Sequence, residues 1–88
     1  MRSGYKDPQD IADYGLSWAK NLGTDTITSS SWIVPDGITA DDDSNTTTTA
    51  TVRLSGGTAG ENYDLTNRVV TASGQRFDCS IRIYVRER

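Results

Sequence analysis

A chain of 88 residues with a formal net charge of −3 has room for one small domain, and it buries too little surface to shape a large internal active site. The sequence contains no histidine, which removes the commonest general base and the commonest transition-metal ligand. Thr, Ser, Gly and Asp are abundant, and this usage favours strands joined by tight turns. We therefore predict an all-β domain that is not an enzyme and holds no cofactor.

Charge is unevenly distributed along the chain. Residues 1–46 carry eight aspartates against three basic residues, whereas residues 47–88 carry six arginines against four acidic residues. Opposite charges in the two parts favour docking between protein surfaces, because complementary fields steer encounters. The acidic total argues against a nucleic-acid partner, and no apolar run reaches the length of a membrane span or a signal peptide. The lone Cys79 cannot form an internal disulfide, which fits assembly in a reducing cytoplasm.

The start of the chain is polar and lacks an apolar period. We predict an extended arm over 1–13, of the kind that becomes ordered on a neighbouring subunit, followed by a single domain over 14–88. A first strand is expected at 14–18, where large apolar residues alternate with small ones. A second strand is expected at 26–34, and the turn chemistry of 35–37 ends it.

Residues 38–45 contain three consecutive aspartates, and their mutual repulsion predicts a solvent-exposed loop. The run Asp41–Asn45 places oxygen donors at alternate positions, as the start of a calcium-binding loop does. However, Thr46 and Val52 stand where such a loop needs a glycine and a bidentate glutamate. We therefore favour a solvated acidic loop over a calcium site.

The rest of the chain predicts three strands, at 46–54, 63–71 and 77–86, separated by a Gly-rich turn at 55–60 and a hairpin turn at 72–75. The last strand alternates most strictly, and its inward positions are Phe77, Cys79, Ile81, Ile83 and Val85. Five or six strands with short turns and no helical period predict a small two-sheet sandwich of immunoglobulin or fibronectin type III character.

Three residues refine the expected core. Tyr63 begins a strand just after a Gly-rich turn, and in immunoglobulin-like sandwiches a tyrosine at this position hydrogen-bonds the preceding loop. Trp18 and Trp32 supply most of the aromatic bulk, so we expect them in or beside the core. The inward register of Cys79 predicts a buried thiol and not a nucleophile.

The outward side of the last strand is the strongest candidate for a binding surface, because Arg and Tyr are the residues that protein interfaces favour. Two interpretations stay open. The outward arginines of this strand, which we call the arginine row (Arg76, Arg82 and Arg86), pair with acidic arms of neighbouring copies, or they protect a solvated edge strand from aggregation. The candidate interface residues, from the arm and from the last strand, are Asp7, Asp10, Asp13, Arg76, Arg82, Tyr84 and Arg86.

Several segments form an ordered set that spans nearly the whole chain. They are Asp7–Asp10, Asp13–Trp18, Leu22–Ile27, Ser31–Trp32, Leu54–Tyr63, Leu65–Val69 and Val85–Arg88. This set resembles a family of small phage virion proteins, the fiber-tail adaptors. The stretch Leu-Ser-Gly-Gly-Thr-Ala-Gly at 54–60 is its most specific part, whereas Ser17 and Cys79 depart from the expected pattern.

The resemblance implies a structural protein of the virion tail, made in the host cytoplasm, that joins fibers or other proteins to the tail in several symmetric copies. It brings no catalytic residues, and we expect no metal, membrane, nucleic acid or small-molecule substrate. Two alternatives stay open. A capsid decoration protein would bind preformed heads, and a carbohydrate- or cell-surface-binding module would expose Trp18 or Trp32 as a stacking platform.

Overall fold

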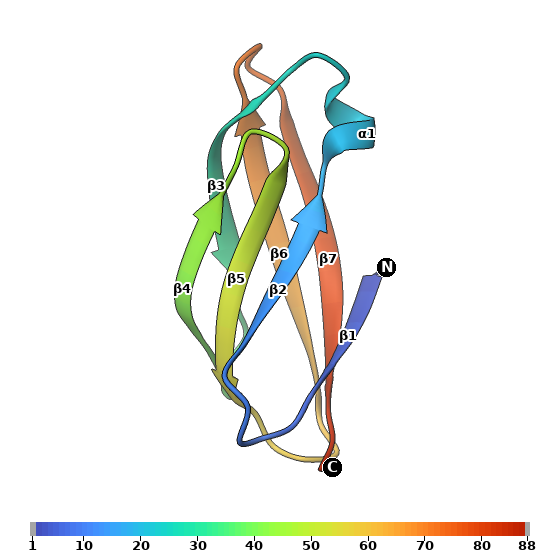
Figure 1. Cartoon of the computed structure of the whole chain (residues 1–88). Helices are drawn as coiled ribbons and strands as arrows, with labels where there is room; N and C mark the ends of the chain where they lie inside the picture. Colours follow the sequence, from blue (N-terminus) through green and yellow to red (C-terminus); the bar gives the residue numbers. More distant parts are fainter. Residues whose placement is uncertain (1, 88) are drawn as a thin grey trace.

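The computed structural model describes residues 2–87 of the chain. They form seven strands and one short helix in an elongated molecule of 41 × 22 × 19 Å (Figure 1). In chain order the elements are β1 (Arg2–Lys6), β2 (Ala12–Ser17), α1 (Ala19–Leu22), β3 (Ile27–Ile33), β4 (Ile38–Asn45), β5 (Thr49–Gly56), β6 (Asn62–Thr71) and β7 (Arg76–Val85). No described helix has the length and apolar character that a membrane span needs.

The strands form two layers, which confirms the prediction of an all-β, two-sheet sandwich. One sheet has the order β1-β7-β6-β3, and the other has the order β2-β5-β4. Neighbouring strands run antiparallel except β1, which pairs with β7 in parallel. The expected strands near the two tryptophans and in the second half of the chain are all present, with ends shifted by at most three residues.

The interior contains two apolar clusters, which lie one after the other along the length of the sandwich. We call the part of the sandwich around the first cluster, near β1, the β1 half, and the part around the second cluster, near α1, the α1 half. The β1 half contains Ile38, Val52, Leu54, Tyr63, Leu65, Ile81, Ile83 and Val85. The α1 half holds Trp18, Leu22, Ile27, Ala50 and Val69, with Phe77 and Cys79 packed against them. Most of these residues lie on β5, β6 and β7, where alternation places them inward, since successive side chains of a strand point to opposite faces. Cys79 is only half-buried, so the expected buried thiol lies at the margin of the core.

The two tryptophans lie in the core, where their ring nitrogens meet different surroundings. Trp18 is 5% exposed, and its Nε1 donates a hydrogen bond to Oδ1 of Asn67 at 2.9 Å. Asn67 is fully buried and also donates to Ser30 Oγ and to the carbonyl of Ser31. Trp32 is half-buried against both clusters, and its buried Nε1 has no hydrogen-bond partner within residues 2–87. Neither tryptophan is the exposed platform that a sugar-binding module was expected to show.

Tyr63 makes the hydrogen bond to the preceding loop that the sequence predicted. The backbone N–H of Thr58 donates to its hydroxyl oxygen at 3.0 Å. The neighbouring Gly57 has a φ of +94°, and a Cβ at this position would lie 2.9 Å from Cγ2 of Val85. The turn therefore needs glycine both for its backbone angle and for its close approach to β7.

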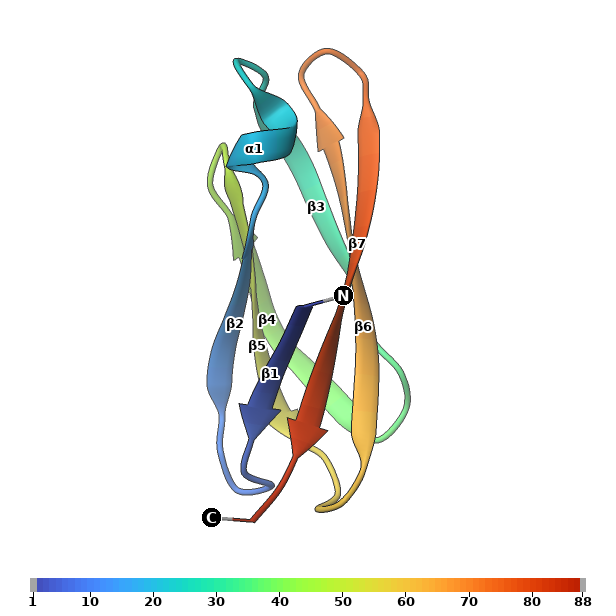
Figure 2. The same ribbon diagram turned by 90° about the vertical axis from the view of Figure 1, so that its right-hand side faces the viewer.

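The segment expected as an arm lies on the sheet of its own chain. Residues 2–6 are extended, but they pair with Ile81–Val85 of β7, and Figure 2 shows β1 between β2 and β7. Lys6 is 2% exposed, and its Nζ donates to the carbonyls of Gly56 at 2.6 Å and Asp7 at 2.9 Å. The expected boundary after residue 13 falls inside β2, so the structure gives no separation between arm and domain at that point.

One local prediction is wrong. Residues 38–45 are not a loop but β4, an edge strand that pairs with β5 through a bulge between Ala40 and Asp42. An edge strand exposes most of its side chains, so it shows no apolar period. The sequence also showed no sign of α1, a single helical turn that buries Leu22 beside Trp18.

Candidate protein interface

The outer face of the four-stranded sheet is the surface on which the predicted arginine row lies. β6 and β7 pair in antiparallel register, so side chains on opposite residues share a face. The pairs on the outer face are Asn62 with Tyr84, Asp64 with Arg82, Thr66 with Ser80, Arg68 with Asp78, and Val70 with Arg76. We call this set the β6–β7 ladder.

Two ion pairs form the middle of the β6–β7 ladder. Arg82 Nε lies 2.8 Å from Asp64 Oδ1, and a second hydrogen bond joins Arg82 Nη2 to Asp64 Oδ2 at 3.1 Å. Arg68 and Asp78 repeat this two-point geometry at 2.9 and 3.0 Å. The hydrogen bonds from the guanidinium groups lower the pKa of both carboxyls, so all four groups stay charged near neutral pH. The centre of the face is therefore strongly polar but has no net charge.

The two ion pairs are joined by neutral groups in the same register. The hydroxyls of Thr66 and Ser80 lie 3.1 Å apart between the two pairs. Each side chain of the two ion pairs and of the Thr66–Ser80 pair thus has a partner on the neighbouring strand, and this partner restricts its rotamers. A surface of this kind is ordered before any partner binds, which lowers the entropy cost of association.

Aromatic groups form one end of the same face. The rings of Tyr5 and Tyr84 stack with centroids 5.4 Å apart, and the guanidinium carbon of Arg86 lies 5.7 Å from the centroid of Tyr84. Tyr5 is 72% exposed. A tyrosine held by a stack and by an arginine presents a rigid apolar surface beside polar groups, which is the composition of interface centres.

The predicted site residues are only partly brought together. Arg76, Arg82 and Tyr84 share the outer face of β7 as the alternation predicted, and Arg86 follows directly after the strand and contacts Tyr84. Asp7 and Asp10 lie in the turn between β1 and β2, where the N–H of Asp10 donates to the carbonyl of Asp7.

Asp13 lies on the opposite sheet, where it pairs with Arg53 at 2.8 Å. Asp13 therefore does not pair with the arginines of β7 within one copy of the chain. The arginine side chain at position 82 has its partner on β6 instead.

Sequence reasoning missed the residues on β6 and Tyr5. The β6 partners were accessible, because the hairpin turn fixes which residues of the two strands oppose one another. Counting outward from the Gly74 turn places Arg76 opposite Val70, and Arg82 then falls opposite Asp64. Tyr5 gave no such signal, since a parallel partner strand lies far away in the sequence.

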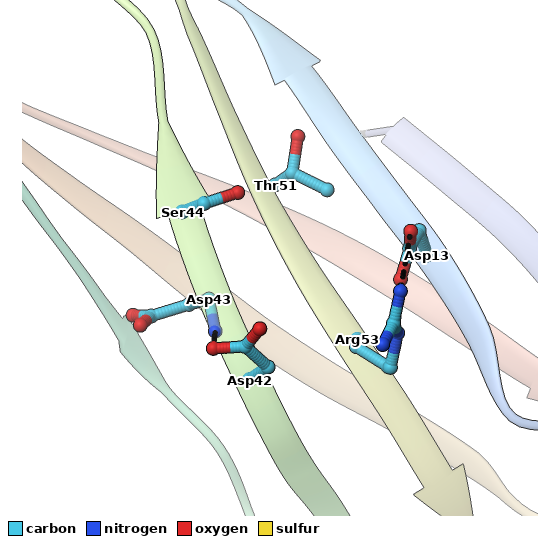
Figure 3. A pocket seen from close by; sticks show the side chains of 6 residues that line it. All are labelled: Asp13, Asp42, Asp43, Ser44, Thr51 and Arg53. Atoms are coloured by element: carbon cyan, nitrogen blue, oxygen red, sulfur yellow. Dashed lines mark hydrogen bonds and ion pairs between the residues drawn. The ribbon is translucent and has the colours of Figure 1, made fainter.

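The outer face of the three-stranded sheet has a different composition. A shallow hollow on this face is lined by Asp13, Asp42, Asp43, Ser44, Thr51 and Arg53. Figure 3 shows Arg53 turned toward Asp13, while Asp43 points to the other side of β4. The hydrogen bond from Arg53 lowers the pKa of Asp13. Small hydroxyl side chains surround this pair, so the face offers little apolar contact area.

The acidic residues do not assemble a metal site in the described part of the chain. No group of three or more His, Cys, Asp or Glu side chains within residues 2–87 is arranged to hold an ion. Asp42 instead accepts a hydrogen bond from the backbone N–H of Asp43 at 2.9 Å.

Comparison with protein families identifies the chain's relatives. The sequence profile of the family described as podophage GP4 fiber-tail adaptor protein gp77 matches residues 6–84. The chain belongs to this family. The match spans every strand except most of β1 and the last residue of β7, and it confirms the resemblance that the sequence indicated. No curated protein matches the chain significantly. The chain is thus a β-sandwich of a phage structural family whose members are named as adaptors between fiber and tail.

Proposed function

We propose that this chain is a structural adaptor in the phage tail and that it binds fibers or other tail proteins through the outer face of its four-stranded sheet. The observation that supports this function is the β6–β7 ladder with the stack of Tyr5 on Tyr84 at its end. Interfaces concentrate their binding energy in Tyr and Arg side chains, and a docking face of this kind needs no cleft and no catalytic group.

Repetition around a symmetric tail would strengthen such a contact. A small domain offers a limited face to each partner, so one copy binds weakly. Several copies on one assembly bind with a much higher overall affinity, because each later contact forms at high effective concentration. Asp7 and Asp10 belong to this proposal as contacts between copies, since they lie at the end of the molecule where β1 turns into β2.

We also propose that the sandwich is related to immunoglobulin-like domains. The hydrogen bond between Thr58 and Tyr63, in a turn before a central strand, supports this relationship. Such domains act by surface complementarity on rigid sheets, which fits an adaptor.

Binding to purified tails tests the proposed function. Tails are prepared from particles that lack this chain, and labelled chain is added and sedimented with them. Tyr84→Ala should weaken binding at least about tenfold, and Arg82→Ala should weaken it less, because the aromatic stack lies at the exposed end of the face. Arg53→Ala is the matched control, since it removes an equivalent ion pair on the opposite sheet.

The outcomes separate the rival functions. Failure of the wild-type chain to bind tails, with binding to empty capsids, would support a decoration protein. Binding of neither, with retention on host cell-surface polysaccharide, would support a carbohydrate-binding module. Equal loss of tail binding in Arg53→Ala and Tyr84→Ala would contradict the choice of face.

A further inference from the structure

The edges of the two sheets differ in how they are protected. An edge strand presents unpaired backbone groups to other chains, and charged side chains or bulges normally block this pairing. β4 has three consecutive aspartates and a bulge, and β2 has Asp13 in an ion pair with Arg53. β1 carries Lys6 and lies between β2 and β7 (Figure 2).

β3 lacks every one of these protections over most of its length. The sequence from Ile27 to Val34 contains no charged residue, proline or glycine. After a bulge near Ile27, residues Ser29–Ile33 pair regularly with β6 on one side. On its other side, no strand of the described chain pairs with β3. Ser29 and Ser31 are exposed and small, and Ile33 is 54% exposed, so an added strand can approach closely.

The surroundings of this edge are acidic. β4 lies next to β3 on the same side of the sandwich (Figure 1). Asp41, Asp42 and Asp43 are all exposed. Asp42 lies on the outer face that also carries Arg53, whereas the side chain of Asp43 points away from β5, across the free edge of β4 (Figure 3). A strand added to β3 would therefore lie next to a strand that carries exposed carboxylates, and exposed charges interact when they are within about 10 Å of each other.

We propose that the free edge of β3 binds an extended strand of a basic partner protein, whose Lys or Arg side chains pair with the aspartates of β4. Backbone hydrogen bonds along Ser29–Ile33 supply the affinity, as in other cases of strand addition. The aspartate run supplies the specificity, because it attracts a basic strand and repels an acidic one. This inference rests on the proposed adaptor function and gives the adaptor a second binding surface, separate from the β6–β7 ladder.

A second copy of the chain fits this edge poorly. Two β3 strands paired side by side would extend one continuous sheet, and the twofold axis would bring the two β4 strands close together on the same side. Each β4 contributes three aspartates, so the contact would place six carboxylates along one boundary. Like charges in this position are destabilising, and the chain offers no basic residue on β3 or β4 to offset them.

Hydrogen exchange on the tail-bound chain tests the pairing of β3. The amide of Ile27 is already bonded to the carbonyl of Thr47, so the test concerns Ser29–Ile33. In the free chain, the amides of this segment that point away from β6 should exchange rapidly, and those bonded to β6 slowly. On binding to purified tails, the rapid group should become protected. Unchanged exchange in this segment while the chain is bound to tails would overturn the proposal and leave the adaptor function standing.

A charge-matched pair of variants tests the partner's chemistry. Asp41→Asn combined with Asp42→Asn and Asp43→Asn should weaken tail binding at least tenfold at low salt, and it should reduce the salt dependence of binding. The control neutralises three exposed acids elsewhere, through Asp36→Asn, Glu61→Gln and Glu87→Gln, and changes the net charge equally.

The proposal predicts that the two triple variants differ in tail binding. Loss of binding only in the β4 variant supports a basic strand at β3. Equal binding of both triple variants, or equal loss in both, overturns it. If the wild-type chain itself does not bind tails, the proposed adaptor function fails first, so the two failures are distinguishable.

Discussion

The two halves of the sandwich are closed in different ways. In the β1 half, a strand closes the open side: β1 pairs with β7, and Lys6 joins it to the carbonyl of Gly56. In the α1 half, a single helical turn covers the interior, and the buried amide of Asn67 joins Trp18 to the backbone of β3. The buried polar group of the β1 half, Lys6, lies on an edge strand beside an apolar cluster, whereas the buried amide of the α1 half lies on the inner strand β6.

The stability of each half therefore depends on a different kind of interaction. Apolar contacts tolerate small adjustments, because they have no fixed direction. A buried amide has fixed donors and acceptors, and loss of one partner leaves others unsatisfied. The α1 half should therefore be the more sensitive to a single polar substitution, and the β1 half should be more sensitive to changes in backbone approach.

The largest effect is expected at Asn67. Asn67→Ala removes a fully buried side chain that accepts from Trp18 and donates to Ser30 and Ser31. The loss leaves a cavity and an unsatisfied indole N–H, so unfolding free energy should fall by roughly 3 kcal/mol in urea melts. Asn62→Ala, on the exposed end of the same strand, is the control and should change stability little. Equal losses in both variants would contradict the role assigned to the amide.

Lys6→Ala should lower the unfolding free energy by a similar or slightly smaller amount, through a loss of stability in the β1 half. The change removes the donor to two backbone carbonyls and the packing of a buried side chain, which together are worth roughly 2 kcal/mol. Amides of β1 should then exchange faster than those of β6. Lys20→Ala is the control, because this lysine is exposed on α1. Unchanged protection of β1 in Lys6→Ala would show that strand pairing alone holds it.

A pair of glycine substitutions separates backbone angle from close approach in the β1 half. Gly57 and Gly60 have φ values of +94° and +90°. A methyl group at Gly57 would meet Val85, whereas at Gly60 nothing lies within 4 Å. Gly57→Ala should cost roughly 2 kcal/mol and Gly60→Ala about 1 kcal/mol in thermal melts, since only the first adds a clash to the strained angle. Equal costs would mean that β7 shifts freely to make room.

The smallest expected effect is a loss of stability of the α1 half at acidic pH. The hydrogen bond from Ser73, at 2.6 Å, is the main cause that lowers the pKa of Asp25 to about 2. A lowered pKa in the folded state means that this stabilisation is complete above the ordinary carboxyl pKa and is lost as the pH falls from about 4 to about 2. Asp25→Asn should flatten the fall in melting temperature over this range. An identical pH profile for both proteins would remove Asp25 from the explanation.

The sequence predicted the hairpin half of the fold well. β6 and β7 alternate strictly between apolar and polar residues, and a glycine turn joins them, so both their faces and their register follow from local patterns. The same alternation placed Arg76, Arg82 and Tyr84 on one outer face. The alternation alone does not identify the residues of β6 that lie opposite them, because this also requires counting the register across the hairpin turn.

The elements that close the sandwich were not predicted, for physical reasons. β1 depends on a parallel partner about 80 residues away in sequence, and its buried lysine has the residue type least expected inside a protein. α1 is one turn long and leaves no period to detect. β4 is an exposed edge, so its aspartates matched a loop as well as a strand. Each of these elements is determined by its tertiary neighbours.

A cryo-electron microscopy map of the intact virion tests the adaptor function most directly. We predict density for this sandwich in the tail, repeated by the symmetry of the assembly, with the outer face of β6 and β7 against a neighbouring tail or fiber protein. A map that shows the domain on the capsid, or shows that outer face open to solvent in every copy, would contradict this function.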